Sequence, residues 1–174
     1  MTPAQTSGQA AGQTAAQTVV ASALLAWNQQ LERAQKLFAP LSDEQLQKEI
    51  APGKNRLIYL YGHLVAVHDR MRPLLGIGPQ LHPQLDAPFL TERDRSVTDA
   101  SLPSAADLKR MWDEVHQSLN DGFGKFTAED WTSKHTAVSD EDFAKNPLRN
   151  RMAVLLSRTS HIAYHLGQGA LVKD

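Results

Sequence analysis

Apolar residues recur at steps of three and four along four long stretches of the chain, a spacing typical of amphipathic helices. The first stretch extends from Thr18 to Leu37. The second extends from Asn55, which is placed as an N-cap, to Gly76, which is placed as a helix stop. The third extends from about Ser104 to Phe126, and the fourth from about Leu148 to Val172. No stretch shows the sustained alternation of apolar and polar residues that predicts a strand. The pattern therefore predicts an all-α four-helix bundle.

The segments between these helices are mostly irregular. The first holds LSDEQLQKEI, where Ser42 or Asp43 is placed to cap a short helix and Gln45 to complete the capping interaction. Residues 77–103 contain four prolines and no sustained period, so we expect a long loop that crosses the molecule. The segment around His135 is also irregular. The bundle should therefore have long second and third connections rather than tight hairpins.

The length of 174 residues suits one domain with a full hydrophobic core. Residues 1–17 consist mainly of Ala, Gln, Thr and Gly and lack the basic and apolar regions of a secretory signal. We therefore expect residues 1–17 to be a flexible N-terminal tail and residues 18–174 to form the bundle domain.

Charge and composition exclude several classes of function. The 18 Lys and Arg residues nearly balance the 19 Asp and Glu residues without a dense basic run, so we expect no nucleic-acid partner. No apolar run approaches the ~20 residues that cross a bilayer, so we expect no membrane partner. Cysteine is absent, which excludes disulfides and restricts a metal site to nitrogen and oxygen ligands. A cytoplasmic location fits this composition.

Two histidines near the end of the chain, His161 and His165, lie four residues apart in the last predicted helix. Their side chains are offset by about 40° and one turn, so both imidazoles can reach one metal ion. They lie at the margin of the buried stripe, which comprises Val154, Leu155, Ile162 and Leu166. Because this spacing is also frequent by chance, the interpretation as two unremarkable residues stays open.

The second predicted helix offers two candidates for a third ligand, His63 and His68. His68 falls within the apolar stripe of Leu57, Tyr61, Leu64, His68, Met71 and Leu75, which indicates a core histidine. His63 lies at the margin, where a metal ion could keep a coordination position accessible to substrate. Helix geometry therefore favours His63 over His68. His116 and His135 are interpreted as structural or surface residues.

The segments YLYGHLVAVHDRM and SHIAYHLGQ together resemble the DinB-like, or YfiT-like, metal-binding family. The family pattern has His-Leu on the second helix and HxxxH, often followed by Gly-Gln, on the last. The resemblance implies a down-up-up-down four-helix bundle, often dimeric, with one divalent ion held by three histidines. Transferred position by position, these ligands are His63, His161 and His165. The pattern does not use His68.

Four other side chains share the faces of the expected ligands. Arg56 and Arg158 each lie within about 20° of a ligand, seven residues away, and could clamp an anionic substrate. The alternative is an ordinary ion pair or a solvated side chain, which we favour for Arg56 and leave open for Arg158. Tyr59 and Gln168 could orient the substrate or a ligand. We therefore expect substrate contacts from Arg158, Arg56, Tyr59 and Gln168.

Three neutral imidazoles would leave a bound ion its full charge and make it a Lewis acid. Zinc suits three nitrogens and one exchangeable water, while nickel or iron(II) require further waters. HxxxH lacks the Glu of HExxH, which disfavours protease-type hydrolysis. The resembled superfamily includes thiol-dependent S-transferases and isomerases, and without cysteine the thiol must come from a low-molecular-weight cosubstrate.

Two hypotheses about function follow. The first is a metal-dependent enzyme, either a thiol-dependent S-transferase or a hydrolase of a small substrate such as an anion. The second is a non-enzymatic metal- or ligand-binding stress-response bundle. The resemblance also implies a homodimer, and Trp27 and the long loop after Gly76 could cover or extend its interface.

Overall fold

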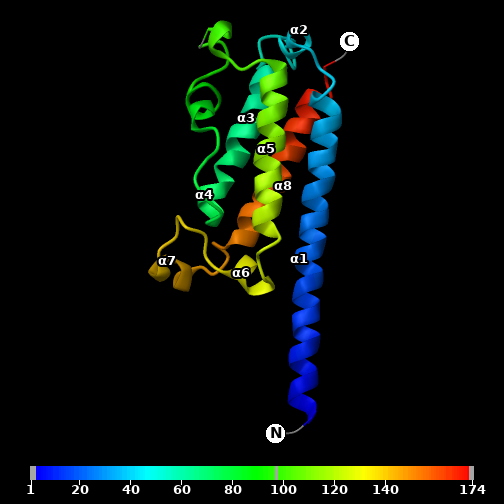
Figure 1. Ribbon diagram of the computed structural model, residues 1–174, viewed down its shortest axis with the longest axis vertical. Helices are drawn as coiled ribbons and strands as arrows, with labels where there is room; N and C mark the ends of the chain where they lie inside the picture. Colours follow the sequence, from blue (N-terminus) through cyan, green and yellow to red (C-terminus); the bar gives the residue numbers. More distant parts are fainter. Residues whose placement is uncertain (1–2, 97, 173–174) are drawn as a thin grey trace.

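The structure, a computed structural model, describes residues 3–96 and 98–172, of which residues 3–14 and Ala100 are described by their backbone alone. Four long helices lie side by side (Figure 1). They are α1 (Pro3–Phe38), α3 (Leu57–Asp69), α5 (Ala105–Phe123) and α8 (Arg151–Gly169). α1 and α8 run in one direction and α3 and α5 in the other, and the described residues contain no β-strand (Figure 1). The predicted all-α bundle is confirmed.

Shorter helices occupy the connections. They are α2 (Asp43–Leu46), α4 (Met71–Leu75), α6 (Ala128–Thr132), α7 (Asp140–Lys145), the 3₁₀ turns η1 (Pro83–Leu85) and η3 (Asp99–Ser101), and the π-helical turn η2 (Ala87–Thr91). The predicted cap of α2 is present, because the Ser42 hydroxyl accepts from the Gln45 N–H and the Gln45 side chain accepts from the Ser42 N–H. The second and third connections are long, as predicted, but they are built from short helical turns rather than plain loop.

The first helix is longer than the sequence pattern predicts. α1 begins at Pro3, so residues 3–17, which we expected to form most of a flexible tail, continue the helix. Residues 1–2 of that tail lie outside the described residues. Ala and Gln are favourable helix formers, and nothing local ends the helix between this segment and the apolar pattern. The N-terminal part of α1 consequently extends beyond the other helices (Figure 1).

The second predicted helix is divided in two. α3 starts after Arg56 rather than Asn55, and no side chain of its own caps it. Instead, the backbone N–H of Arg56 donates to the Asp94 carboxylate, whose negative charge suits a helix N-terminus. α3 ends at Asp69 and α4 continues to Gly76, whose φ of 77° ends the helix as predicted.

Aromatic side chains bring the helices together in the core. The rings of Phe38 on α1 and Tyr61 on α3 stack with centroids 4.8 Å apart. Trp27 of α1 is fully buried and contacts Phe123 of α5 with centroids 6.3 Å apart. The suggestion that Trp27 lies at a subunit interface is therefore wrong. Its indole is large and apolar enough to fill the centre of the bundle.

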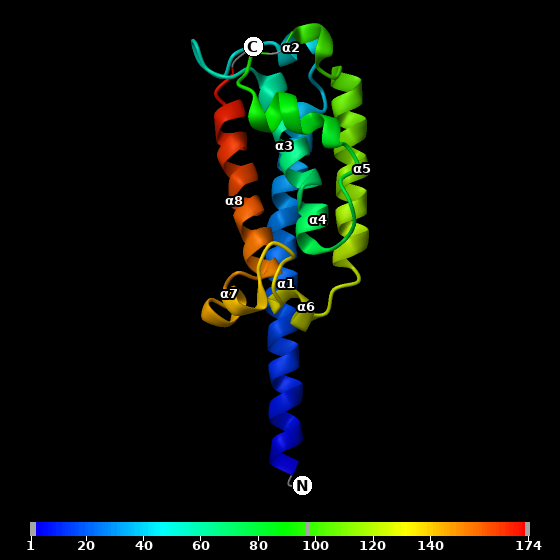
Figure 2. The same cartoon turned by 90° about the vertical axis from the view of Figure 1, so that its left-hand side faces the viewer.

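The long connection after Gly76 runs back along α3, where the views of Figures 1 and 2 place it. Hydrogen bonds and ion pairs join it to α3 and to the residues that flank this helix: Arg56 with Asp94, Tyr59 with the Glu92 carbonyl, His63 with the Phe89 carbonyl, Asp69 with the N–H groups of Leu81 and His82, and Arg70 with Asp86. The connection is thus fixed to one helix along its length.

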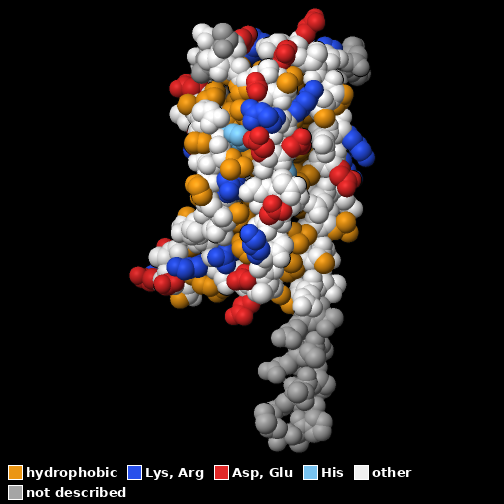
Figure 3. Space-filling view, viewed as in Figure 1, with side chains coloured by type: hydrophobic (Ala, Val, Ile, Leu, Met, Phe, Trp, Pro, Cys, Tyr) orange, Lys and Arg blue, Asp and Glu red, His pale blue; other side chains and the backbone are white. Residues whose placement is uncertain are grey.

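On the face seen in Figure 3, acidic and basic side chains are interspersed, with small apolar areas between them. The near balance of charge in the sequence is therefore also a local balance on this face. Among the described residues, no helix combines the length and the apolar character needed to span a membrane.

Candidate metal centre

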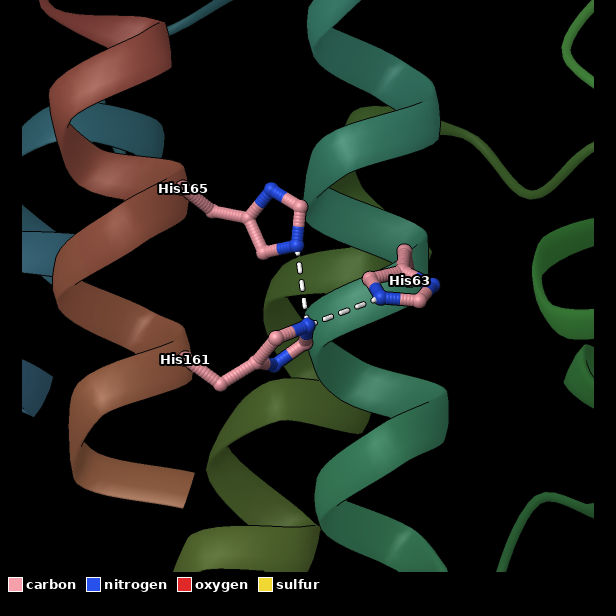
Figure 4. Close-up of side chains that lie close together, drawn as sticks. All are labelled: His63, His161 and His165. Carbon is pink, nitrogen blue, oxygen red and sulfur yellow. Dashed lines mark hydrogen bonds between the residues drawn. The ribbon is translucent and has the colours of Figure 1, made fainter. Parts of the chain in front are cut away.

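Three histidines from two helices meet at the boundary between α3 and α8 (Figure 4). His63 comes from α3, and His161 and His165 come from successive turns of α8. The two helices run antiparallel and side by side, so a margin position on one faces margin positions on the other (Figures 1 and 2). One nitrogen from each side chain lies within 4.8 Å of the other two. The sequence-predicted ligand set is thus brought together.

The distances between these nitrogens suit a metal ion. His161 Nε2 lies 3.2 Å from His63 Nε2 and 3.0 Å from His165 Nε2. Bonds of about 2.0–2.1 Å separate two nitrogens by about 3.3–3.4 Å in a tetrahedron. Adjacent ligands of an octahedral ion with similar bonds lie about 3.0 Å apart. Small side-chain rotations would therefore complete either geometry.

Hydrogen bonds fix the tautomers of two of the rings. His63 Nδ1–H donates to the Phe89 carbonyl over 2.9 Å, and because a carbonyl can only accept, Nδ1 must carry the proton. His165 Nδ1–H donates to the Gln168 side-chain oxygen over 2.7 Å. Both rings therefore turn an unprotonated Nε2 toward the centre of the cluster. This pairing of the outer nitrogen is common for metal-ligating histidines.

The third ring cannot satisfy both neighbours. His161 Nε2 faces the Nε2 atoms of His63 and His165, each of which offers a lone pair. A neutral His161 places at most one proton there, and if its proton is on Nδ1, it places none. At least one close nitrogen–nitrogen contact then lacks a well-aligned proton. A cation between the three lone pairs removes this conflict, so the donor set fits a metal ion.

Burial keeps the three imidazoles in the neutral form that a metal requires. It is the main cause that lowers the pKa of His161 to about 4, and the neighbouring His165, His63 and Arg158 add to the effect. Burial also lowers the pKa of His63 and of His165, although the bonds to Phe89 and Gln168 oppose it. The lowered pKa values therefore favour the neutral imidazole, which carries one proton, in all three rings.

The two arginines expected near the site have different surroundings. Arg56 is only 4% exposed, and its guanidinium pairs with Asp94 and Asp99 at 2.7 Å each. This is the ion-pair alternative, so Arg56 does not serve as a free clamp. Arg158 has no hydrogen-bond or ion-pair partner among the described residues, and its Nε is buried. Burial lowers the pKa of Arg158, and its charge lowers the pKa of His63 and His161.

Tyr59 and Gln168 lie next to two histidines of the cluster. The Tyr59 ring is nearly parallel to that of His63, with centroids 6.2 Å apart, and its hydroxyl donates to the Glu92 carbonyl over 3.0 Å. Gln168 bridges His165 and the hydroxyl of Tyr164, which is 63% exposed. Gln168 thus orients the His165 ring, Tyr59 lies beside the His63 ring, and Tyr164 adds an aromatic group to the edge of the cluster that the sequence did not indicate.

His68, His116 and His135 lie outside the cluster. His68 is fully buried and, as predicted, belongs to the core, where its Nδ1 lies 2.8 Å from His116 Nε2. His116 Nδ1–H donates to the Trp112 carbonyl, so His116 is the structural residue that we predicted. His135 is partly buried in the connection before α8 and belongs to none of these groups.

Sequence reasoning did not identify the contribution of Phe89 and Gly62. The hydrogen bond to His63 uses a backbone carbonyl, which has no signature in a sequence. A signal did exist in Gly62, since a glycine inside an apolar helix costs about 1 kcal/mol relative to alanine and often marks a close approach. The Phe89 ring packs directly against it.

The sequence profile of the DinB superfamily matches residues 26–168, which include all three histidines and all four long helices apart from the first part of α1 and the last residue of α8. No curated protein matches the chain significantly.

Proposed function

The chain belongs to the DinB superfamily, and from that premise we propose that His63, His161 and His165 hold one divalent metal ion in an enzyme for small anionic substrates. The observation that carries the proposal is the approach of three Nε2 atoms that have too few protons between them. Zinc or nickel suits three imidazoles best, and iron(II) also fits.

Arg158 supports an anionic substrate. A divalent ion beside this guanidinium gathers positive charge in a partly buried place, and no carboxylate belongs to the cluster in the described part of the chain. Such charge is costly to bury without a counterion. A carboxylate, phosphate or thiolate on the substrate would offset it, and Arg158 could bind the first two through paired hydrogen bonds.

Thiol transfer is the reaction that we favour. A divalent ion held by neutral imidazoles supplies Lewis acidity that lowers the pKa of a bound thiol or water. Water attack usually needs a protein base as well, and no Asp or Glu joins the three histidines among the described residues. In the transfer, the thiol sulfur bonds to an electrophilic carbon, which releases its leaving group with the electron pair, while the thiol proton passes to solvent.

The chain's own residues would prepare this step. Phe89 and Gln168 fix the rings of His63 and His165, and Arg158 orients the anionic part of the substrate. Tyr164 and Tyr59 offer aromatic surface at the edge. Because the chain has no cysteine, the thiol comes from a small cosubstrate, which a reducing compartment such as the cytoplasm supplies.

The test is an activity screen of zinc- and nickel-loaded protein with low-molecular-weight thiols and small electrophiles. The quantity measured is the decrease in free thiol. The matched control is the variant in which His161 and His165 are both alanine. Metal-dependent turnover that the double variant lacks is the expected result. Metal binding without turnover of any thiol and electrophile pair would instead support a non-enzymatic ligand-binding protein.

A further inference from the structure

The π-helical turn η2 lies against α3 and includes the backbone carbonyl that accepts from His63. Two hydrogen bonds from α3 hold this segment. His63 donates to the Phe89 carbonyl, and Tyr59 donates to the carbonyl of Glu92, three residues further along the chain. Phe89 itself is fully buried, and its ring lies 6.0 Å from that of Tyr59. The carbonyl that orients His63 is therefore anchored by the side chain of its own residue.

Gly62 makes room for this anchor. A Cβ at residue 62 would lie 2.3 Å from two atoms of the Phe89 ring and 2.6 Å from a third. Atoms do not approach so closely, and the ring is rigid and enclosed, so a larger side chain at this position must push Phe89 away from α3. Because the ring and the carbonyl belong to one residue, the push also moves the acceptor of the His63 hydrogen bond.

The backbone conformation at residue 62 does not itself require a glycine. The glycine lies in the interior of α3, where its φ is that of an ordinary helix and no turn requires it. The three nearest atoms to its missing Cβ all belong to Phe89. The close approach of η2 to the helix is therefore the physical reason for glycine immediately before the ligand.

We propose that Gly62 and Phe89 are positioning residues for His63, and that their contact sets the tautomer and direction of this metal ligand. The proposal rests on the metal-binding function proposed above and adds the residues that orient the histidine on α3. Fixing the proton on Nδ1 leaves Nε2 free to bind metal. Gln168 does the same for His165 with a side chain, whereas His63 depends on backbone held by packing.

A matched pair of substitutions separates positioning from packing. Gly62→Ala is compared with Gly122→Ala on α5, where a Cβ would lie 2.6 Å from the Ile77 side chain, also in the connection after α4. Both variants overpack the contact between a helix and the same connection, but α5 carries none of the three histidines. We expect Gly62→Ala to weaken Zn²⁺ binding by about 10- to 100-fold, the usual cost of losing an outer-shell partner, and Gly122→Ala to leave it unchanged.

A second readout does not need metal. In the metal-free protein, ¹⁵N NMR of the imidazole nitrogens should show the proton of His63 on Nδ1 in the wild type and in Gly122→Ala. In Gly62→Ala it should show a mixture with the Nε2–H tautomer. If Gly62→Ala does not fold, Phe89→Ala, which removes the anchor, replaces it, and Phe123→Ala serves as a second buried phenylalanine away from the site.

The outcomes are distinct. If the wild type shows His63 Nδ1–H without binding Zn²⁺, the metal-binding function fails, and with it the proposal. If the wild type binds Zn²⁺ but Gly62→Ala, or Phe89→Ala in its place, keeps wild-type affinity and tautomer, the proposal alone is overturned. Equal weakening in both members of the matched pair also overturns it, because overpacking would then explain the effect.

Discussion

Replacing His63 and His68 separately with alanine should give opposite results, although both lie on α3 only five residues apart. His63 is partly exposed and offers one of three converging nitrogens, so His63→Ala removes a metal bond and little packing. His68 is fully buried and bonded to His116, so His68→Ala leaves a cavity and an unpaired buried nitrogen but keeps all three ligands.

The magnitudes follow from these surroundings. A cavity together with a lost buried hydrogen bond costs about 3 kcal/mol, or about 6–12 °C in the melting temperature of a chain of this size. Metal present at about 1,000 times its Kd stabilises the folded protein by about 4 kcal/mol, or about 8–16 °C. His63→Ala should lower metal affinity by more than the about 10- to 100-fold typical of an outer-shell partner.

Thermal melts with and without a chelator measure both effects. The chelator should lower the melting temperature of the wild type and of His68→Ala, and it should leave that of His63→Ala unchanged. Without metal, only His68→Ala should melt well below the wild type. A chelator effect that persists in His63→Ala and vanishes in His68→Ala would refute the assignment and make His68 the ligand.

Three further predictions concern charge and assembly. Burial lowers the pKa of His116 to about 4, so the folded state binds fewer protons than the unfolded state as pH falls below about 6.5. The free energy of unfolding of the chelator-treated wild type should therefore fall by about 2 kcal/mol between pH 7 and pH 5 through this group. Urea unfolding at the two pH values should show a smaller fall in His116→Gln, and a fall equal to that of the wild type would contradict the assignment. Arg158→Gln should weaken binding of inorganic phosphate to the zinc-loaded protein, as measured by calorimetry. Arg56→Gln should leave phosphate binding intact but cost about 3 kcal/mol of stability, because the buried Asp94 carboxylate loses its partner. The reverse pattern would exclude Arg158 as the clamp. Light scattering at micromolar concentration should give the mass of a homodimer, and a monomer mass would refute that expectation.

The sequence predicted those features that depend on local pattern. Helix periodicity located the four long helices, and Gly76 was correctly placed as a stop because its left-handed φ suits glycine. The spacing of His161 and His165 followed from the geometry of one helix. His63 and His68 were separated by their places on the apolar stripe, which burial in the folded chain reflects.

Features that depend on distant contacts could not be predicted in this way. Arg56 lies on the same helix face as His63, but the carboxylates that pair with it come from a connection whose course has no periodic signal. For the same reason, the pattern could not show that Phe89 supplies the acceptor for His63. The start of α1 at Pro3 could not be predicted because Ala and Gln are common both in flexible tails and in helices.

Elemental analysis of protein purified without added metal tests the central claim most directly. We expect close to one equivalent of a divalent ion per chain in the wild type and its loss when His161 and His165 are both replaced by alanine, because a single imidazole from His63 remains. A double variant that is folded and retains the full wild-type metal content would contradict the account, since the ion would then lie elsewhere in the molecule.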